Sequence, residues 1–236
     1  MTDELRRNPP AEHVAGPRPP LSTTAACELV IGANAVSAIL VEGWSDQAAL
    51  VALARRRGWD LHAEGVVIVP IGGATNIDRF ARALGPCGLD VRLAGLCDVA
   101  EVPQVRRGLA RAGIGADPAD AGSTEALGFF VCDADLEDEL IRAVGTAGVE
   151  RVLDAEGELV SFRRFQAQPA QRGRDHQAQL RRFMGTRAGR KIRYGSLLVD
   201  ALALDRVPRA LDLALAHGRG RKAEAGERVT NDHPTR

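Results

Sequence analysis

Apolar and polar positions along the chain form blocks that predict strands followed by helices. An apolar run ends at Val41, and a helical period from Asp46 to Arg57 follows it. The same order recurs, with strands predicted at 66–69, 91–97 and 129–132 and helices predicted to end at Leu84 and to cover 102–112 and 136–144. Buried strands that alternate with helices predict an α/β fold: a mainly parallel four-stranded sheet flanked by helices.

The two ends of the chain differ from this pattern. Residues 1–25 hold five of the twelve prolines and few large apolar side chains, so we predict a disordered N-terminal arm. Residues 218–236 have no helical or strand period and are predicted to be a disordered tail, which leaves Lys222 without a site role. Between them we expect an α/β domain at 26–160 and a helical C-terminal extension at 161–217, packed on that domain and broken near Gly185 and Pro208.

Composition narrows the class of protein. The chain has 236 residues, net charge zero, 45% apolar and 26% charged residues, which excludes collagenous and wholly disordered chains. No apolar stretch is long enough for a membrane helix and no signal sequence is present, so we expect a cytoplasmic protein without a membrane partner. The single cysteines Cys27, Cys87, Cys97 and Cys132 indicate neither disulfides nor zinc, and we interpret them as small buried residues.

The neutral total hides two blocks of opposite charge. Residues 133–158 contain nine acidic and two basic residues, whereas residues 161–193 contain ten basic and one acidic. Such asymmetry predicts a polyanionic partner beside an acidic site. The predicted phosphate contacts of nucleic acid are Arg181, Arg182, Arg187, Arg190 and Arg193. The interleaved Phe162, Phe165, Phe183 and Tyr194 are interpreted as core residues, with base stacking as the alternative.

Carboxylates follow three of the four predicted strands. They are Glu42 and Asp46 after the first strand, Asp98 and Glu101 after the third, and Asp135, Glu137, Asp138 and Glu139 after the fourth. Because the carboxyl ends of parallel strands share one edge of the sheet, these residues are expected to form one acidic pocket. Clustered carboxylates repel one another unless a cation neutralises them, and Mg²⁺ binds through such oxygens. The alternative is that Asp46 and Glu137 complement helix dipoles while the others are solvated, but three acidic strand ends favour the metal pocket.

The segment from Ile39 to Asp46 resembles the start of a TOPRIM domain, the acidic module of topoisomerases, primases and OLD-family (overcoming lysogenization defect) nucleases. Gly72-Gly73, Asp98 and the acidic segment 134–140 follow the order of that family. Residues 180–185 and 189–194 are similar to the C-terminal nuclease region of OLD proteins. The resemblance covers roughly residues 37–216 and implies the Rossmann-like TOPRIM fold for residues 26–160.

The resemblance also implies an activity, that of a metal-dependent DNA endonuclease or nickase. Such an enzyme hydrolyses phosphodiester bonds with two Mg²⁺ or Mn²⁺ ions, which polarise the phosphate and stabilise the leaving oxygen. By the same resemblance Glu42 and Lys191 are the catalytic candidates, and the metal ligands are Glu42, Asp46, Asp98, Asp135 and Glu137. Ala100 stands where the family has a second aspartate, and Glu101 is the candidate that replaces it.

Two alternative functions and two questions about partners stay open. Ala100 favours a degenerate, non-catalytic TOPRIM module that binds nucleic acid or a partner. A topoisomerase-like strand transfer would need a tyrosine, and Tyr194 is the single one in the chain. No G-x-x-x-x-G-K-[ST] motif occurs, so we expect no ATPase activity from this chain. Complete OLD-type proteins carry an ATPase domain, so the resemblance implies a separate ABC-type ATPase chain as a candidate partner. Self-association into a homo-oligomer is also left open.

Overall fold

Four parallel strands form the centre of the molecule. The computed structural model describes residues 19–115, 123–187 and 189–220. The strands are β1 (Ser37–Val41), β2 (Val66–Pro70), β3 (Arg92–Asp98) and β4 (Phe129–Cys132), and their order in the sheet is β2-β1-β3-β4. In register, Leu40 pairs with Val69 and with Gly95, and Asp98 pairs with Cys132. The predicted α/β class and the parallel four-stranded sheet are confirmed.

Alternate side chains along each strand fill two separate cores, as the period of a strand requires. Ile39, Ile68 and Phe130 belong to the core on one face, whereas Leu40, Val69 and Phe129 belong to the core on the other. All five residues of β1 are buried, which is expected for an inner strand of a parallel sheet. The sheet is therefore covered by helices on both faces.

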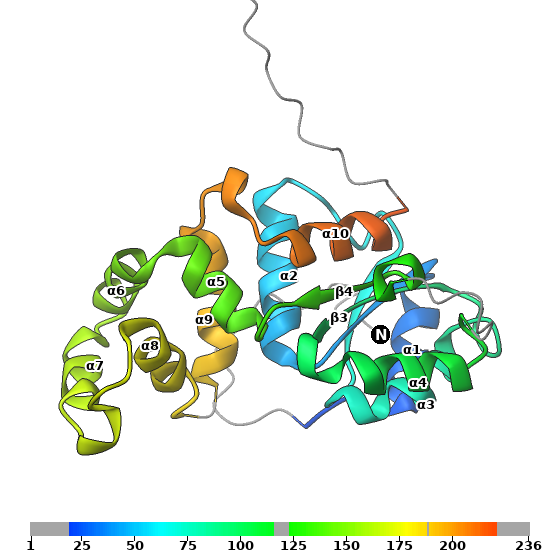
Figure 1. Cartoon of the computed structure of the whole chain (residues 1–236). Coiled ribbons are helices and arrows are strands. Elements are labelled where there is room, and N and C mark those ends of the chain that lie inside the picture. Colours follow the sequence, from blue (N-terminus) through cyan, green and yellow to red (C-terminus); the bar gives the residue numbers. More distant parts are fainter. Residues whose placement is uncertain (1–18, 116–122, 188, 221–236) are drawn as a thin grey trace, which may run out of the picture.

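The two layers of helices are visible in Figure 1, one on each side of the sheet. One core contains residues of α1, α3 and α4, and the other contains residues of α2, α5, α9 and α10. The bounds are α1 (Thr23–Gly32), α2 (Trp44–Arg56), α3 (Ile77–Leu84), α4 (Val102–Arg111), α5 (Leu136–Val144), α9 (Arg190–Ala201) and α10 (Arg209–Gly218). Because α10 packs against the sheet, the chain returns to the α/β core after it leaves at α5.

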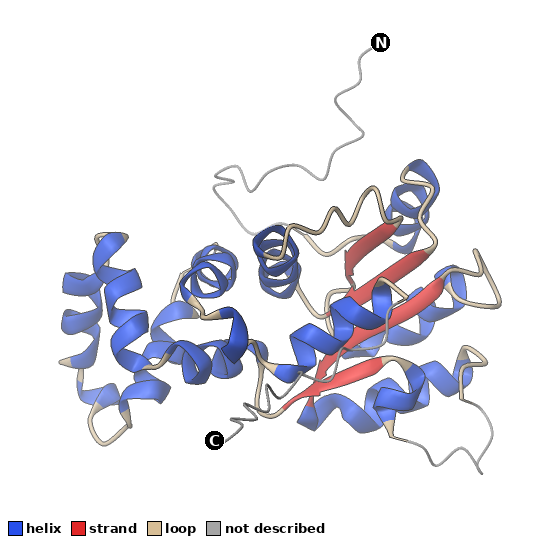
Figure 2. Ribbon diagram, turned by 90° about the horizontal axis from the view of Figure 1, so that it is seen from above, coloured by secondary structure: helices blue, strands red, loops and turns tan. Residues whose placement is uncertain are grey.

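A helical lobe lies beside the sheet, beyond the ends of the strands (Figures 1 and 2). Its helices α6 (Thr146–Ala155), α7 (Leu159–Gln166) and α8 (His176–Met184) pack on α5 and on one another. Phe162, Phe165 and Phe183 are buried there, and Phe183 contacts both other rings, so the interpretation of these aromatics as core is confirmed. Within the described residues, no helix is long and apolar enough to cross a bilayer.

Helix α9 joins the lobe to the sheet through a close contact with α2. Gly195 of α9 lies against the first turn of α2, and a Cβ at this position would stand 2.6 Å from the carbonyl oxygen of Ser45. That separation is shorter than real Cβ contacts, so the approach requires glycine. The contact brings the start of α9 near the acidic residues that follow β1.

The structure corrects several predictions at the ends of the chain. Helix α1 begins at Thr23, within the predicted arm, because the side chain of Ser22 caps it by accepting a hydrogen bond from the Ala25 amide. At the other end Arg219 is buried against Trp59 and pairs with Glu64 at 2.5 Å, so the predicted mobile tail begins too early. The rest of the predicted arm (1–18) and of the tail, including Lys222, lies outside the described residues.

The structure also corrects the interpretation of the cysteines and adds a helix. Cys87 is exposed and Cys27 is half-buried, so only Cys97 and Cys132 fit the interpretation of the cysteines as buried residues. Helix α6 was not predicted, because Gly148 interrupts its helical period. Gly145, which has a positive φ, lies just before the helix as its N-cap.

Candidate metal and nucleic-acid site

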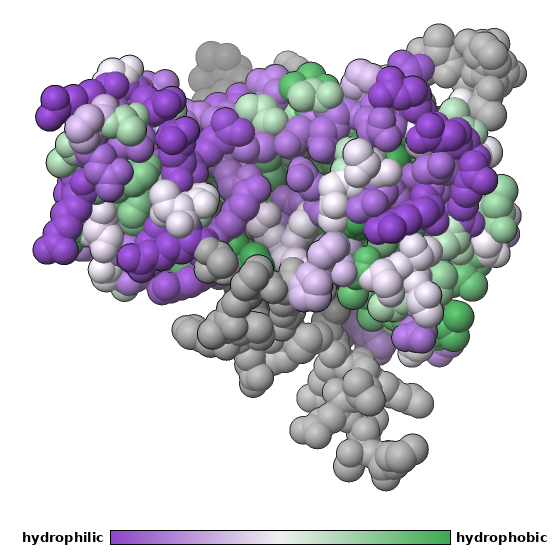
Figure 3. Space-filling model, turned by 90° about the horizontal axis from the view of Figure 1, so that it is seen from below, coloured by the Kyte–Doolittle hydropathy of each residue, from purple (hydrophilic) through white to green (hydrophobic). Residues whose placement is uncertain are grey.

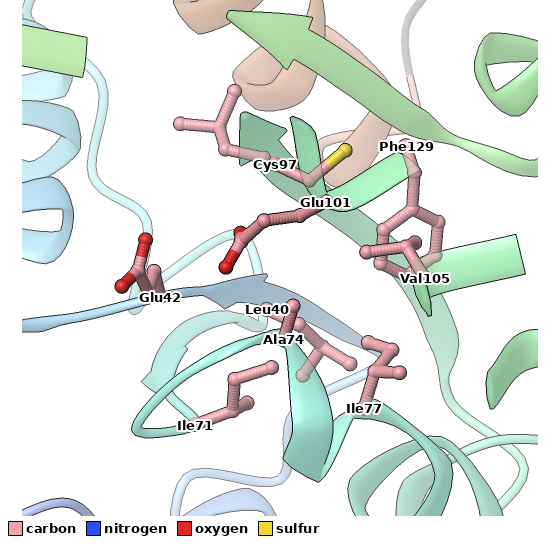
Figure 4. Close-up of a pocket in the computed structure, with 10 residues that line it drawn as sticks. Leu40, Glu42, Ile71, Ala74, Ile77, Cys97, Glu101, Val105 and Phe129 are labelled. Carbon is pink, nitrogen blue, oxygen red and sulfur yellow. The ribbon is translucent and has the colours of Figure 1, made fainter. Parts of the chain in front are cut away.

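Short turns after β1 and β3 place three carboxylates together at the edge of the sheet. Oxygens of Glu42, Asp98 and Glu101 all lie within 4.8 Å of one another, and we call these residues the carboxylate trio. Figure 4 shows the side chain of Glu101 extending toward Glu42. In the described part of the chain, no basic side chain forms an ion pair with the trio. The trio could bind a metal ion, since no other described residue neutralises its charge through an ion pair.

The position of Glu101 follows from a 3-10 turn. Residues Val99–Glu101 form this turn, η3, directly after β3 and before α4. It carries the chain round so that Ala100 is exposed while Glu101 is half-buried and faces Glu42. A residue one position later, with a side chain one methylene longer, thus occupies the place beside Asp98.

Electrostatics of the trio favour a bound cation. Burial, followed by the charges of Glu42 and Asp135, raises the pKa of Asp98 to about 7. Burial and the charge of Glu42 also raise the pKa of Glu101. Carboxylates that resist ionisation because they are crowded and poorly solvated ionise readily when a divalent ion joins them. The donor set therefore fits a divalent metal.

A second acidic region lies where α2, α5 and α9 meet. It contains Asp46 of α2, Asp135 at the N-cap of α5 and Glu137 in its first turn, and we call it the paired acid group. Each of the two α5 acids has a basic partner. Lys191 Nζ lies 3.1 Å from Glu137 Oε2, and Arg181 Nε donates to Asp135 Oδ2 at 2.7 Å. The protein itself thus supplies cations to this region.

Burial affects the paired acid group strongly. Asp46 is 8% exposed, and burial raises its pKa to about 7 even though its carboxylate accepts a hydrogen bond from the Gly43 amide at 2.8 Å. Burial also raises the pKa of Glu137, against the opposing charge of Lys191. For Lys191 burial disfavours the charge, but the charge and hydrogen bond of Glu137 outweigh it and raise the lysine pKa.

One oxygen of Glu137 has no partner. Its side chain is 6% exposed, and Oε1 is buried without a hydrogen bond in the described part of the chain. A buried carboxylate oxygen without a partner costs free energy, and such an atom needs an explanation. A metal ion or a water held by the substrate would satisfy it, so this atom also fits a ligand site.

A cavity of about 430 Å³ opens between the paired acid group and α8. Arg174, Arg181, Arg182 and Lys191 supply its basic lining, while Asp135 and Glu137 supply its acidic lining. We call it the arginine cavity. Figure 3 shows that the surface of the helical lobe is largely hydrophilic. Arg174 was not selected from the sequence, because nothing in the basic block distinguishes its orientation from that of its neighbours.

The structure separates the arginines predicted to contact nucleic acid. Arg182 and Arg187 are exposed and have no ion pair among the described residues. Arg181 is half-exposed but held by Asp135, and Arg193 pairs with Glu156. Arg190 is 6% exposed and engages Glu158, the carbonyl of Phe183 and the Thr186 hydroxyl, so its predicted phosphate contact is wrong.

The hydroxyl of Tyr194 is hydrogen-bonded to a residue outside both acidic groups. It is buried, and its hydroxyl donates to Glu158 Oε2 at 3.2 Å. Burial and the charge of Glu158 raise its pKa, which makes the phenol a poorer nucleophile at neutral pH. Although Lys191 and Tyr194 share α9, the topoisomerase-like alternative has no support in this arrangement.

Comparisons with known proteins agree with this geometry. A family model described as "Overcoming lysogenization defect protein-like, TOPRIM domain" matches residues 35–99, from β1 through β3. Glu42, Asp46 and Asp98 lie within the match. A search of curated proteins found no match.

Solved structures with a similar fold come from two bacteria. The C-terminal region of the Burkholderia pseudomallei OLD protein is 24% identical with a TM-score of 0.57, covering 79% of this chain and 98% of that one. One structure of the C-terminal region of the Xanthomonas campestris pv. campestris OLD protein is 26% identical with a TM-score of 0.58, covering 79% and 95%. Another structure of the same region is 24% identical with a TM-score of 0.60 and the same coverage. These likenesses extend beyond the matched segment into the helical lobe.

Proposed function

Residues 35–99 belong to the OLD-like TOPRIM domain family, and on this premise we propose that the chain is a metal-dependent DNA endonuclease or nickase. The observation that carries the proposal is the carboxylate trio, three acidic side chains within 4.8 Å and without a basic partner in the described residues. Beside it, Lys191 and the arginine cavity offer positive charge to a phosphate. Phosphodiester hydrolysis by a two-metal mechanism uses carboxylates that hold the metal ions and cations that offset the charge of the phosphate.

Two Mg²⁺ or Mn²⁺ ions would be held by different residues. Glu42, Asp98 and Glu101 would hold the first, and Asp46, Asp135 and Glu137 are the candidates for the second. Bound divalent ions would supply Lewis acidity toward the scissile phosphate. In this scheme Glu101 replaces the aspartate that the family has at position 100.

The chain's own cations would act on the substrate. Lys191 is half-exposed at the start of α9, and its ammonium would offset negative charge that develops on the phosphate as the bond breaks. The exposed Arg182 and Arg187 would neutralise neighbouring phosphates without reading sequence. Binding of this kind weakens as salt rises, and cutting is expected to be largely sequence-independent.

Conversion of supercoiled plasmid to nicked or linear DNA tests the proposal. Purified protein is assayed with Mg²⁺, Mn²⁺ or EDTA, beside Glu42→Ala and Lys191→Ala. We expect metal-dependent cleavage that falls by about 100-fold or more in each variant. Glu28→Ala, an exposed glutamate on α1, and Arg206→Ala, an exposed arginine, are the matched controls and should cleave normally.

The second candidate function is a non-catalytic module, and Ala100 is the observation that favours it. It predicts DNA binding without cleavage under any metal. Absence of cleavage together with salt-sensitive DNA binding would establish this function in place of the nuclease. Equal cleavage by wild type and Glu42→Ala would instead point to a contaminating nuclease.

A further inference from the structure

The arginine cavity has the size of a small-ligand site rather than of a duplex groove. Its volume of about 430 Å³ lies within the range of pockets that take small molecules. The start of α5, helix α8 and the start of α9 form its walls. A B-DNA duplex, whose two grooves alone measure about 12 Å and about 6 Å across, is too wide to enter such a space as a paired helix. A single nucleotide can.

Charge makes the cavity selective for an anion. Four cations and two carboxylates line it, and the two carboxylates are already paired with Arg181 and Lys191. Arg182 has no ion pair in the described residues, and Arg174 donates from Nε to the Ala170 carbonyl at 3.2 Å, which leaves its terminal nitrogens available. Two guanidinium groups thus remain to bind one phosphate, and their planar forks match its oxygens.

The remaining lining suits the rest of a nucleotide. Ala178 contributes apolar surface to the wall formed by α8, and the buried Met184 lies behind this wall. A sugar or a base presents apolar faces that such a wall can cover. Glu137 of the paired acid group also lines the cavity, and its buried Oε1 has no hydrogen bond among the described residues.

We infer that the arginine cavity binds one unpaired nucleotide of the substrate strand, with its phosphate on Arg174 and Arg182. This inference rests on the proposed function and deepens it, because it assigns a single-stranded or terminal segment as the substrate. The bound nucleotide lies next to the paired acid group, so it is a neighbour of the bond that is cut. Arg174 and Arg182 position the strand and take no part in the chemistry.

Binding of thymidine 5′-monophosphate to the full chain tests the inference directly. Titration calorimetry measures its affinity with Ca²⁺ present, for wild type, Arg174→Gln, Arg182→Gln and the double variant. We expect a loss of about fivefold for each single variant and at least tenfold for the double variant. Thymidine, which lacks the phosphate, should bind at least tenfold more weakly than the monophosphate.

Arg164→Gln is the matched control, since Arg164 is an exposed arginine of α7 outside the cavity lining. Circular dichroism and the melting temperature establish that each variant is folded. Equal affinity for the monophosphate in Arg164→Gln and in the double variant, or no monophosphate binding by wild type, would overturn the inference.

Cleavage assays separate this inference from the proposed function. A single-stranded oligonucleotide and its duplex are compared as substrates at equal concentration, and the single strand should be cut faster. Monophosphate binding that depends on Arg174 and Arg182, without cleavage of any DNA, would support nucleotide binding in the arginine cavity and contradict the proposed nuclease activity. If the duplex is cut faster than the single strand, and the arginine variants cut as fast as wild type, the nuclease activity would be supported. Nucleotide binding in the arginine cavity would then be contradicted.

Discussion

The carboxylate trio and the paired acid group contain the same number of acidic residues but balance their charge in opposite ways. In the described residues Glu42, Asp98 and Glu101 have no basic partner. In the paired acid group, by contrast, Lys191 and Arg181 each hold a carboxylate. Crowded carboxylates without a cation repel one another, so binding of a metal ion stabilises them most. Carboxylates that already have a basic partner must give up that ion pair before they can bind a metal.

This difference predicts unequal affinity for metal. The trio should take the first ion tightly, and the paired acid group should take a second ion weakly, when a phosphate draws Lys191 and Arg181 away from their partners. Substrate and second metal would then bind together. The four predictions below alter one side of this comparison at a time, and they run from the largest expected effect to the smallest.

Lys191→Ala distinguishes two effects of this lysine, its competition with metal for Glu137 and its contribution to cleavage. Removal of the ammonium frees Glu137, so Mn²⁺ should bind the paired acid group severalfold more tightly while cleavage falls by about 100-fold. Calorimetric titration of Mn²⁺ and single-turnover cleavage at saturating metal give the two quantities. A parallel loss of metal affinity and cleavage would contradict this assignment and make Lys191 a structural residue. Arg206→Ala serves as the control.

Gly195→Ala tests how the start of α9 is held against α2. The added methyl group would stand 2.6 Å from the backbone oxygen of Ser45, so α9 must move away from the paired acid group. We expect a loss of about 2 kcal/mol in the free energy of unfolding. Chemical denaturation measures it, and Gly32→Ala on α1, where a Cβ meets no atom within 4 Å, is the matched control. First-ion affinity at the trio should stay unchanged.

Sequence alone predicted the fold well where the period was strong. The strand predicted at 129–132 and the helix predicted at 136–144 have the same bounds as β4 and α5. Helix α1 escaped prediction because it follows a proline-rich stretch and is apolar on several sides, which removes the contrast that marks an amphipathic helix. The spacing of apolar residues therefore identified strands that are fully buried and helices with one apolar face. It did not identify α1, whose faces differ little in hydrophobicity.

The sequence predicted which acidic and basic residues lie at the site, but not which of them form ion pairs with one another. Shared strand ends were enough to bring Glu42 and Asp98 together. The pairing of Asp135 with Arg181 depends on how the lobe docks, and 46 positions separate the two residues. Burial of Arg190 depends on the rotation of α9, which its packing on α2 fixes. Such long-range placement leaves no trace in local spacing.

Glu101→Ala tests whether the trio needs its third member. Loss of one carboxylate ligand should weaken binding of the first Mn²⁺ at least about tenfold, because even the loss of an outer-shell partner of a ligand costs about 10- to 100-fold. Ala100→Asp added to this variant should not restore affinity, because the 3-10 turn leaves position 100 exposed. Calorimetric titration of the three proteins decides it. Full recovery in the double variant would show that the turn can rotate and that position 100 is equivalent.

The smallest effect concerns the pH dependence of folding without metal. Asp98 has a pKa raised to about 7 by burial and by Glu42, so the folded protein holds this proton more tightly than the unfolded chain. Its contribution is therefore fully present below the unfolded pKa near 3.8 and is lost as pH rises through about 7. Asp98→Asn removes this loss. Unscreened, a rise of the pKa from 3.8 to about 7 would correspond to about 4 kcal/mol, but solvent at this half-buried carboxyl screens most of it. Relative to wild type the variant should gain about 1 kcal/mol, or ~3 °C in melting temperature, between pH 4 and pH 8 in EDTA.

The same scan with Mg²⁺ should reverse the order of the two proteins at pH 8. A bound ion favours the ionised trio, so wild type gains stability from metal that Asp98→Asn cannot gain fully. The difference between the two proteins cancels contributions from other groups, such as Glu125 and Glu150, whose pKa values Arg209 and Arg163 lower by hydrogen bonding. Parallel pH profiles in EDTA would mean that Asp98 is well solvated, and the trio would then differ little from the paired acid group in its need for a cation.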